Sequence, residues 1–131
     1  AIVEAREIHP IETTFELVAI IEDAVGGAYK RQKIHSATRT FQAIRIAVND
    51  ELGTLSTGMN RGFEALNVGG RLAVISFHSL EDRIVKKFFK AKVDAGEGIL
   101  INKKIIVAGT EEIKNNSRAR SAKLRILEKT K

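Results

Sequence analysis

Apolar residues recur at helical spacing through the first half of the chain. Residues 11–24 place them three or four positions apart, with enough apolar neighbours to predict a helix buried on more than one side. Gly26 and Gly27 suit the end of this helix, and the polar stretch 28–33 is expected to form a loop. Residues 1–7 also have a helical pattern, but neither a capping residue nor an initiator methionine precedes them. We therefore expect the chain to begin within a longer protein.

Two more helices are expected, over residues 38–52 and, after Gly53, over residues 54–67. The helix over residues 54–67 is expected to face the core with one apolar stripe, made of Leu55, Met59, Phe63 and Leu66. The first has an apolar stripe and also a polar side, whose residues project together because they lie three or four positions apart. These polar residues are Arg39, Gln42, Arg45 and Asn49. Their spacing alone is compatible with either solvent or a ligand on this side.

The clearest unit in the second half is a strand followed by a helix. Residues 72–77 form an unbroken apolar run, which predicts a strand covered on both faces, as in a parallel sheet between layers of helices. Ser79 is expected to cap the following amphipathic helix, with Asp82 completing a capping box. The predicted buried stripe of this helix consists of Ile84, Val85, Phe88 and Phe89.

Two later strands are expected over residues 99–107 and 122–127, with antiparallel pairing between them. The segment that joins them is polar and basic. A strand, a helix and two further strands suit one flank of an α/β sheet, but three strands do not make a complete one.

The composition limits the class of protein. A chain of 131 residues that is 44% hydrophobic is long and apolar enough for one domain with a real core. It contains no cysteine, so disulfides and thiolate metal sites are excluded, and its three histidines lie far apart in sequence. We expect no metal site. No apolar run approaches the roughly 20 residues of a membrane helix, and no secretory leader is recognisable, so a cytoplasmic protein is expected.

The formal net charge of +6 favours a polyanionic partner, because neutralising phosphates drives much of nucleic-acid affinity. The basic residues form two clusters. One is Lys30, Arg31, Lys33 and Arg39, and the other lies near the C-terminus at Lys114, Arg118, Arg120, Lys123, Arg125, Lys129 and Lys131.

Three blocks of the sequence carry a more specific signal: HSATRTFQAIRIAVNDEL (35–52), GGRLAVISFHSLEDRIVKKFF (69–89) and NNSRARSAKLRILEK (115–129). In order and approximate spacing they resemble three blocks of the bacterial 16S ribosomal RNA cytosine-N4 methyltransferases. The resemblance extends over almost the whole chain. It departs from the family pattern at Ser36 and Ser117, where proline is usual, and this affects the expected conformation of the loops that face RNA.

The resemblance implies the C-terminal part of a class I methyltransferase, an α/β protein with a Rossmann-like, doubly wound sheet flanked by helices. It also implies a helical insertion that helps to hold RNA. We expect residues 1–57 to contain this insertion and a connecting helix, and residues 58–131 to belong to the α/β domain.

The cofactor implied by the resemblance is S-adenosyl-L-methionine. In the family, the glycine-rich loop and the other residues that bind it precede the region that this chain resembles, so we expect them outside this chain. Gly96-Glu97-Gly98 is a poor substitute, because a strand follows it where a nucleotide-binding loop requires a preceding strand and a following helix.

Methylation of cytosine N4 requires the base to leave its stack and enter a shaped pocket. His78 and Asn49 are the candidate catalytic residues, and Phe77 and Ser79 are candidates for the substrate pocket, since sites in α/β proteins form where strands end. The candidate RNA contacts are Lys33, His35, Arg39, Gln42, Arg45, Arg118, Arg120 and Lys123.

Structural interpretations stay open for several of these residues. His78 or Ser79 can serve as the cap of the turn into the helix, and Phe77 can pack in the core. Arg45 and Asn49 can belong to a structural network with Asp50 and Glu51. Lys123 and Arg125 can simply alternate outward from a strand.

The function has two interpretations at this stage. The chain is either part of an active methyltransferase that acts on 16S rRNA or the small ribosomal subunit, or a non-catalytic RNA-binding or structural fragment. Association of two copies into a homodimer is a further possibility, because an exposed sheet edge and apolar faces need cover.

Overall fold

The computed structural model describes residues 1–27 and 34–131, which form two compact units, Ala1–Asn49 and Asp50–Lys131. We call them the N-terminal and C-terminal units. The loop expected over 28–33 and the candidate contact Lys33 lie outside the described residues. The domain boundary expected after residue 57 stays a prediction. Residue 57 lies inside one continuous helix, α5 (Glu51–Ala65), and the two compact units are divided between Asn49 and Asp50.

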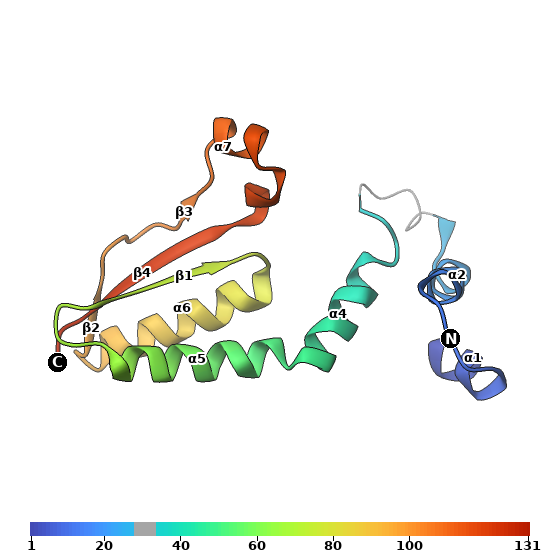
Figure 1. Cartoon of the computed structure of the whole chain (residues 1–131), viewed down its shortest axis with the longest axis horizontal. Coiled ribbons are helices and arrows are strands. Elements are labelled where there is room, and N and C mark those ends of the chain that lie inside the picture. Colours follow the sequence, from blue (N-terminus) through green and yellow to red (C-terminus); the bar gives the residue numbers. More distant parts are fainter. Residues whose placement is uncertain (28–33) are drawn as a thin grey trace. The chain divides into compact units, whose positions relative to one another are not determined.

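The N-terminal unit contains helices α1 (Ile2–Ile8), α2 (Thr14–Ala24) and α4 (Thr38–Asn49), as Figure 1 shows. The helix predicted over residues 11–24 is confirmed as α2. A capping box sets its start, because the Thr13 hydroxyl accepts from the Glu16 N–H and the Glu16 carboxylate accepts from the Thr13 N–H. The predicted burial on several sides is wrong: Ile21 is buried, but Phe15 is 84% exposed.

The helix expected over residues 38–52 ends earlier than predicted. Asp50 has φ 45°, a left-handed conformation that stops α4 at Asn49, and α5 starts at the next residue. Gly53 is therefore not a break but part of the first turn of α5. A Cβ at Gly53 would overlap the Asp50 carboxylate, so the glycine gives that side chain room.

Strand β4 (Lys123–Lys129) is the strand to which the other described strands of the C-terminal unit pair, all of them antiparallel. These strands are β1 (Arg71–Ser76), β2 (Gly98–Leu100) and β3 (Ile106–Val107). The α/β class and the antiparallel pairing of the last strands are confirmed. The strand expected over 99–107 is instead two short strands. Helix α7 (Thr110–Asn115) and the 3-10 helix η1 (Ser117–Ser121) occupy the connection to β4.

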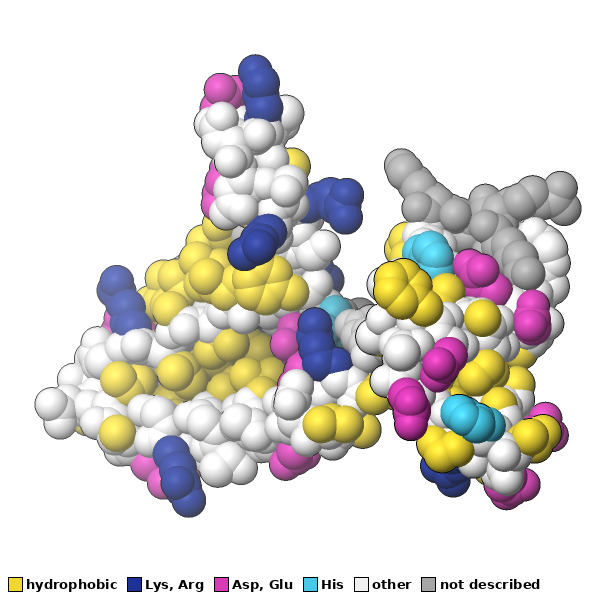
Figure 2. Space-filling model, turned by 45° about the vertical axis from the view of Figure 1, so that its right-hand side comes forward, with side chains coloured by type: hydrophobic (Ala, Val, Ile, Leu, Met, Phe, Trp, Pro, Cys, Tyr) yellow, Lys and Arg dark blue, Asp and Glu magenta, His cyan; other side chains and the backbone are white. Residues whose placement is uncertain are grey.

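The prediction that β1 lies in a parallel sheet covered on both faces is wrong for the described residues. β1 pairs antiparallel with β4, with Arg71 opposite Glu128 and Ser76 opposite Lys123. Its burial alternates along the strand, and Ile75 is 56% exposed. One face of the sheet therefore keeps apolar side chains at the surface, and Figure 2 shows hydrophobic side chains gathered on the unit that carries α7.

Helices α5 and α6 (Ser79–Asp94) cover the other face of the sheet (Figure 1). The buried core between helices and sheet consists of Met59, Phe63, Val85, Phe89 and Leu127. Leu55, Leu66, Ile84 and Phe88 are partly buried against it, so the inward stripes predicted for both helices are confirmed. Among the described residues, no helix combines the length and apolar character that a membrane span requires.

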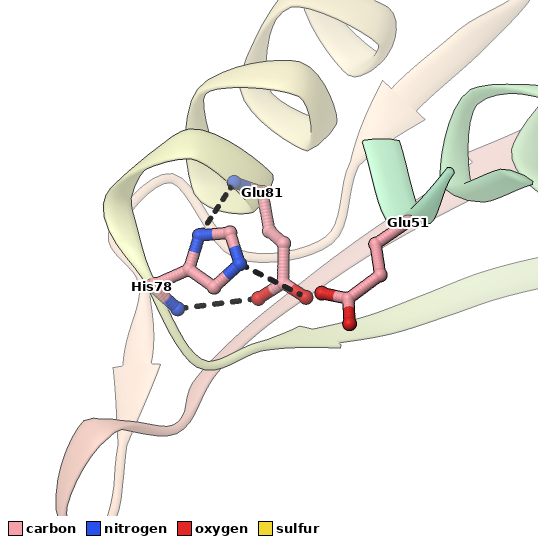
Figure 3. A group of neighbouring side chains, drawn as sticks. All are labelled: Glu51, His78 and Glu81. Carbon is pink, nitrogen blue, oxygen red and sulfur yellow. Dashed lines mark hydrogen bonds and ion pairs between the residues drawn. The ribbon is translucent and has the colours of Figure 1, made fainter. Parts of the chain in front are cut away.

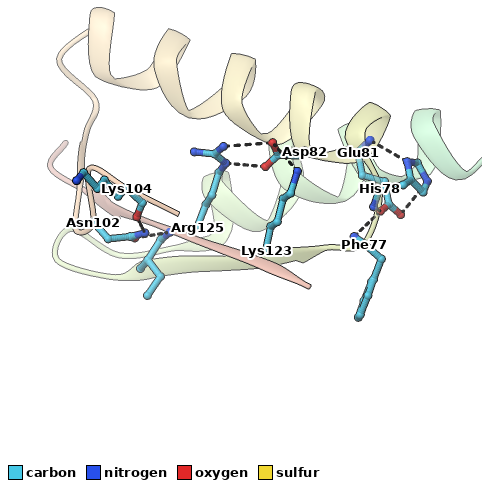
Figure 4. A network of polar contacts seen from close by, with 9 residues as sticks. Phe77, His78, Glu81, Asp82, Asn102, Lys104, Lys123 and Arg125 are labelled. Atoms are coloured by element: carbon cyan, nitrogen blue, oxygen red, sulfur yellow. Dashed lines mark hydrogen bonds and ion pairs between the residues drawn. The ribbon is translucent and has the colours of Figure 1, made fainter. Parts of the chain in front are cut away.

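Polar contacts fix α6 on β4. The Arg125 guanidinium donates to both carboxylate oxygens of Asp82, at 2.9 and 3.3 Å, and Lys123 Nζ lies 3.8 Å from the same carboxylate (Figure 4). The hydrogen bonds and positive charge of Arg125, together with the charge of Lys123, lower the pKa of Asp82. Lys123 and Arg125 thus face α6 instead of pointing outward.

Phe89→Ala should lower the free energy of unfolding by about 3–5 kcal/mol, because it empties a site that is only 1% exposed in the core. The measurement is urea unfolding followed by circular dichroism. Phe15→Ala is the matched control and should change stability by less than about 0.5 kcal/mol. Equal losses for the two variants would contradict the assigned core.

Asp82→Asn should cost about 1–3 kcal/mol at neutral pH, because Arg125 then loses a charged hydrogen-bond partner. A carboxyl with a lowered folded-state pKa stabilises the fold above its unfolded pKa of about 3.9, and this contribution is lost as pH falls through the lowered value. The difference in stability between wild type and Asp82→Asn should therefore shrink below about pH 4. Asp94→Asn, which removes an exposed partner of Lys90, is the control and should cost at most about 0.5 kcal/mol.

Candidate active site

His78 lies in the short connection between β1 and α6, at the carboxyl end of the strand. It is the N-cap of α6: its Nδ1 accepts from the Glu81 N–H at 3.3 Å. The Glu81 carboxylate accepts in return from the N–H groups of His78 and Phe77, at 3.2 and 2.8 Å. The capping role left open for His78 is confirmed.

The capping box expected from Ser79 and Asp82 is therefore one residue out of register. Ser79 is the first residue of α6, and its side chain is not the cap. The imidazole ring supplies the acceptor that a serine hydroxyl was expected to supply. Asp82 is unavailable for capping because Arg125 binds its carboxylate.

Glu51, from the first turn of α5, completes a cluster with His78 and Glu81. One oxygen or nitrogen from each of the three side chains lies within 4.8 Å of the others (Figure 3). Neither glutamate was predicted from the sequence to be a site residue. Glu81 follows His78 at the spacing of a capping box, but histidine is not one of the residues that signal an N-cap in a sequence. Glu51 had no such signal, because it comes from a different helix.

The capping bond determines which ring nitrogen of His78 carries the proton. Since Nδ1 accepts a hydrogen bond, the neutral ring must be protonated at Nε2. Nε2 is buried and lies 3.5 Å from a Glu81 carboxylate oxygen, without hydrogen-bond geometry. The Nε2–H thus lies near the Glu81 carboxylate without a hydrogen bond to it.

This arrangement is unfavourable for a metal ion, although the three groups are close enough to share one. Coordination by Nε2 would require its lone pair, so the neutral ring would carry its proton on Nδ1. That proton would then face the Glu81 N–H, and the helix would lose its cap. The cluster is better suited to hold a proton than a cation.

A second unsatisfied polar atom lies close by in sequence. Ser76 is only 2% exposed, and within the described part of the chain its hydroxyl and His78 Nε2 are the buried side-chain polar atoms without a hydrogen-bond partner. Buried polar groups normally find partners, so two exceptions at the end of one strand mark a candidate functional site.

The other predicted pocket residues are not part of this cluster. Phe77 is 52% exposed, and Figure 4 shows its ring pointing away from α6. Ser79 is exposed at the start of that helix. Asn49 is the last residue of α4 and belongs to the N-terminal unit.

Three of the predicted RNA contacts come together in the N-terminal unit. His35, Gln42 and Arg45 line a hollow of about 690 Å³. Arg39 is exposed on the same helix, outside the lining of this hollow.

His35, which borders this hollow, is held in place by a side chain of helix α2. His35 Nε2 lies 3.4 Å from the Glu22 carboxylate, and the Ser36 hydroxyl donates to the same oxygen. Ser36, where proline is usual in the family that the sequence resembles, therefore helps to fix the start of α4.

The remaining predicted contacts differ from one another. Arg118 and Arg120 are exposed on η1, whereas Lys123 is partly buried beside Asp82. Only the first two therefore present their charge freely to solvent.

The glycine pair Gly96 and Gly98 has structural roles. Gly96 has φ 67° and donates to the Val93 carbonyl at the end of α6, which is a helix C-cap. A Cβ at Gly98 would lie 3.0 Å from the Glu128 carbonyl oxygen, so the strands require this glycine for close approach. Neither fits a loop that holds a nucleoside cofactor.

Comparison with known proteins agrees with the family resemblance. The family model described as "MraW methylase family" matches residues 1–130. Over 129 residues the chain is 52% identical to "Ribosomal RNA small subunit methyltransferase H" of Coprothermobacter proteolyticus, and it is 54% identical to the protein of that name from Elusimicrobium minutum. In Exiguobacterium sibiricum the identity is 50% over 143 residues.

The matches cover 98% of this chain but only 42%, 43% and 46% of those three relatives, respectively. The chain thus spans less than half the length of the curated relatives it matches. Because the family model extends over essentially every residue, the chain belongs to the MraW methylase family.

Proposed function

We propose that the chain is part of an S-adenosylmethionine-dependent methyltransferase that acts on N4 of a cytosine in 16S rRNA of the small ribosomal subunit, in the cytoplasm. The family match and the names of its relatives support methylation of small-subunit rRNA. In this proposal the N-terminal unit is the helical insertion. The C-terminal unit is one flank of a class I, Rossmann-like sheet, which we expect to be the C-terminal part of its domain.

The observation that carries the proposal is the polar cluster at the carboxyl end of β1. Ligands of α/β proteins bind beyond the carboxyl ends of strands, where helix starts and loops converge. Glu51, His78 and Glu81 lie at the carboxyl end of β1, and the buried Nε2 of His78 without a hydrogen-bond partner supports a functional role for this group.

In this site His78 acts as a positioning residue. Its ring is largely buried and its Nε2 is inaccessible, so a base would not reach it directly. The ring instead caps α6 and places its Nε2–H near the carboxylates of Glu51 and Glu81 (Figure 3). Glu81 is committed to the backbone of the helix start.

Glu51 is the proposed proton acceptor, because it is the member of the cluster that takes no part in the capping box. When N4 of cytosine gains a methyl group, it must release one of its two protons. A carboxylate oxygen within hydrogen-bond reach can accept that proton. This is a step that the chain's own residues can perform.

S-adenosylmethionine would supply the methyl group when bound. The glycines available among the described residues do not fit it, so we propose that its binding residues belong to the part of the relatives' length that this chain does not span.

The RNA would contact the hollow lined by His35, Gln42 and Arg45, together with the exposed Arg39. Arg118 and Arg120 on η1 are proposed to bind phosphates at a second contact with the RNA. The RNA contact expected from Lys33 stays a prediction. Asn49 also stays a prediction for a contact near the target base. Association of two copies into a homodimer also stays a prediction.

The alternative function is an RNA-binding or structural fragment without catalysis, which the exposed Arg118 and Arg120 on η1 favour. Binding of labelled S-adenosylmethionine by the full-length protein would exclude it. Salt-sensitive RNA binding without cofactor binding would support it.

The full-length protein, incubated with labelled S-adenosylmethionine and unmodified small ribosomal subunits, should produce N4-methylcytidine, identified by mass spectrometry of digested nucleosides. Glu51→Gln should lower kcat by about 100-fold, because the amide accepts a proton poorly. Glu64→Gln, on the exposed side of α5, should leave kcat unchanged. A ring-methylated cytidine product would contradict the N4 assignment, and equal rates for both variants would contradict the role of Glu51.

His78→Asn separates capping from the role of the imidazole. Asparagine is a good N-cap, so this variant should retain nearly full stability, whereas His78→Ala should lose about 1 kcal/mol. Both variants lack Nε2–H, so both should lower kcat by about tenfold or more with little change in KM. Full activity of His78→Asn would show that His78 is a helix cap and nothing more.

A further inference from the structure

A second hollow lies further along α6, beyond the cluster of Glu51, His78 and Glu81 at the start of the helix. Its volume is about 210 Å³, and it is lined by Lys86, Phe89, Lys90, Val93, Leu100, Asn102, Lys103 and Arg125. Four of these residues are cations, contributed by α6, by the segment after β2 and by β4. Phe89, Val93 and Leu100 supply an apolar floor beneath them.

The charge around this hollow is positive after its ion pairs are taken into account. Lys90 binds Asp94 at 2.6 Å, and Arg125 binds Asp82. Within the described residues, no carboxylate lies within ion-pair distance of Lys86 or Lys103. A ligand that enters this hollow therefore meets two lysines without a direct ion pair, in addition to the guanidinium at its wall. The charge of Lys86 also acts on the Asp82 carboxylate and helps to lower its pKa.

The segment that carries Lys103 is held in place. The Asn102 side chain donates to the Lys104 carbonyl at 2.6 Å and accepts from the Ile126 N–H at 3.1 Å (Figure 4). The Ile101 N–H donates to the Ile126 carbonyl. The backbone around Lys103 is therefore fixed against β4, which reduces the entropy lost when the lysine binds a ligand.

The size and charge of the hollow decide between ligands. Sites that enclose a drug-sized molecule usually have volumes of about 300–1,000 Å³, so this one suits part of a nucleotide. Its positive charge opposes the sulfonium of S-adenosylmethionine and favours a phosphate. The apolar floor can accommodate a ribose beside that phosphate.

We propose that this hollow binds a phosphate and its ribose in the backbone of the RNA substrate, at a distance from the target base. The assignment rests on the proposed function, because it assumes an RNA substrate. Lys86 and Lys103 bind the phosphate, and the fixed segment 101–104 sets its position. The RNA thus contacts α6 along its length as well as the carboxyl end of β1.

The test compares Lys86→Ala/Lys103→Ala with Lys87→Ala/Lys104→Ala in the full-length protein. The control pair lies on the same two segments, removes the same charge and does not line the hollow. The probe is a fluorescent single-stranded RNA titrated at several salt concentrations. Loss of the contact with this one phosphate should reduce the slope of log K against log salt by about 0.7 and weaken binding by about tenfold or more.

The control pair should change the slope by less than half as much. Equal effects of the two pairs, or an unchanged slope for the first pair, would overturn the proposal. Inorganic phosphate at constant ionic strength is the second arm. Displacement of RNA from wild type, but not from Lys86→Ala/Lys103→Ala, would support an RNA phosphate in the hollow. Binding of phosphate to wild type without displacement of RNA would assign the hollow to free phosphate and overturn the proposal.

Kinetics distinguish failure of this inference from failure of the proposed function. Lys86→Ala/Lys103→Ala should raise KM for the small ribosomal subunit about tenfold and leave kcat almost unchanged. If Lys86→Ala/Lys103→Ala still forms N4-methylcytidine and its KM is unchanged, the proposed function stands and the proposed phosphate site is wrong. If the wild-type protein methylates nothing, the proposed function is wrong, and the RNA titration still tests the phosphate site.

Discussion

The packing of one strand against two helices controls the geometry of the C-terminal unit. Alternate residues of β4 face the helical layer: Arg125 binds Asp82 of α6, Leu127 is fully buried between the helices and sheet, and Lys129 donates to three carbonyls at the end of α5. The pairing register with β4 also fixes the position of β1. Because α6 begins directly after β1, β4 indirectly fixes where His78 lies. The candidate site thus depends on a strand that contributes no residue to it.

The N-cap role of His78 links helix formation to proton placement. A serine or aspartate at this position would satisfy the helix equally well, but neither would place an N–H between two carboxylates. The imidazole satisfies two requirements at once: its acceptor nitrogen caps α6, and its donor nitrogen faces Glu51 and Glu81. The cost is a buried nitrogen without a hydrogen-bond partner among the described residues, which is a feature more typical of reactive sites than of helix starts.

Periodicity predicted the helices and the inward-facing core residues, because a 3.6-residue repeat is a local property of the sequence. It failed where a local signal had two explanations. Gly53 suggested a helix break, but Asp50 adopts the left-handed conformation that makes the break. The apolar run in β1 suggested parallel neighbours, yet the described sheet is antiparallel. Glu51 escaped notice because its role arises only when α5 packs beside α6, and no spacing rule connects those two segments.

The basic C-terminal cluster shows why charge counted along a sequence overstates the charge available to RNA. Alternation along β4 turns Lys123, Arg125 and Lys129 toward the helices, where Asp82 and helix carbonyls occupy them. The arginines of η1 precede this alternation and stay exposed. Lys86 and Lys103, which lie outside the cluster, come together only because α6 packs against the end of β2. The electropositive surface that RNA would meet is therefore determined by the fold, and it differs from the one that the sequence suggests.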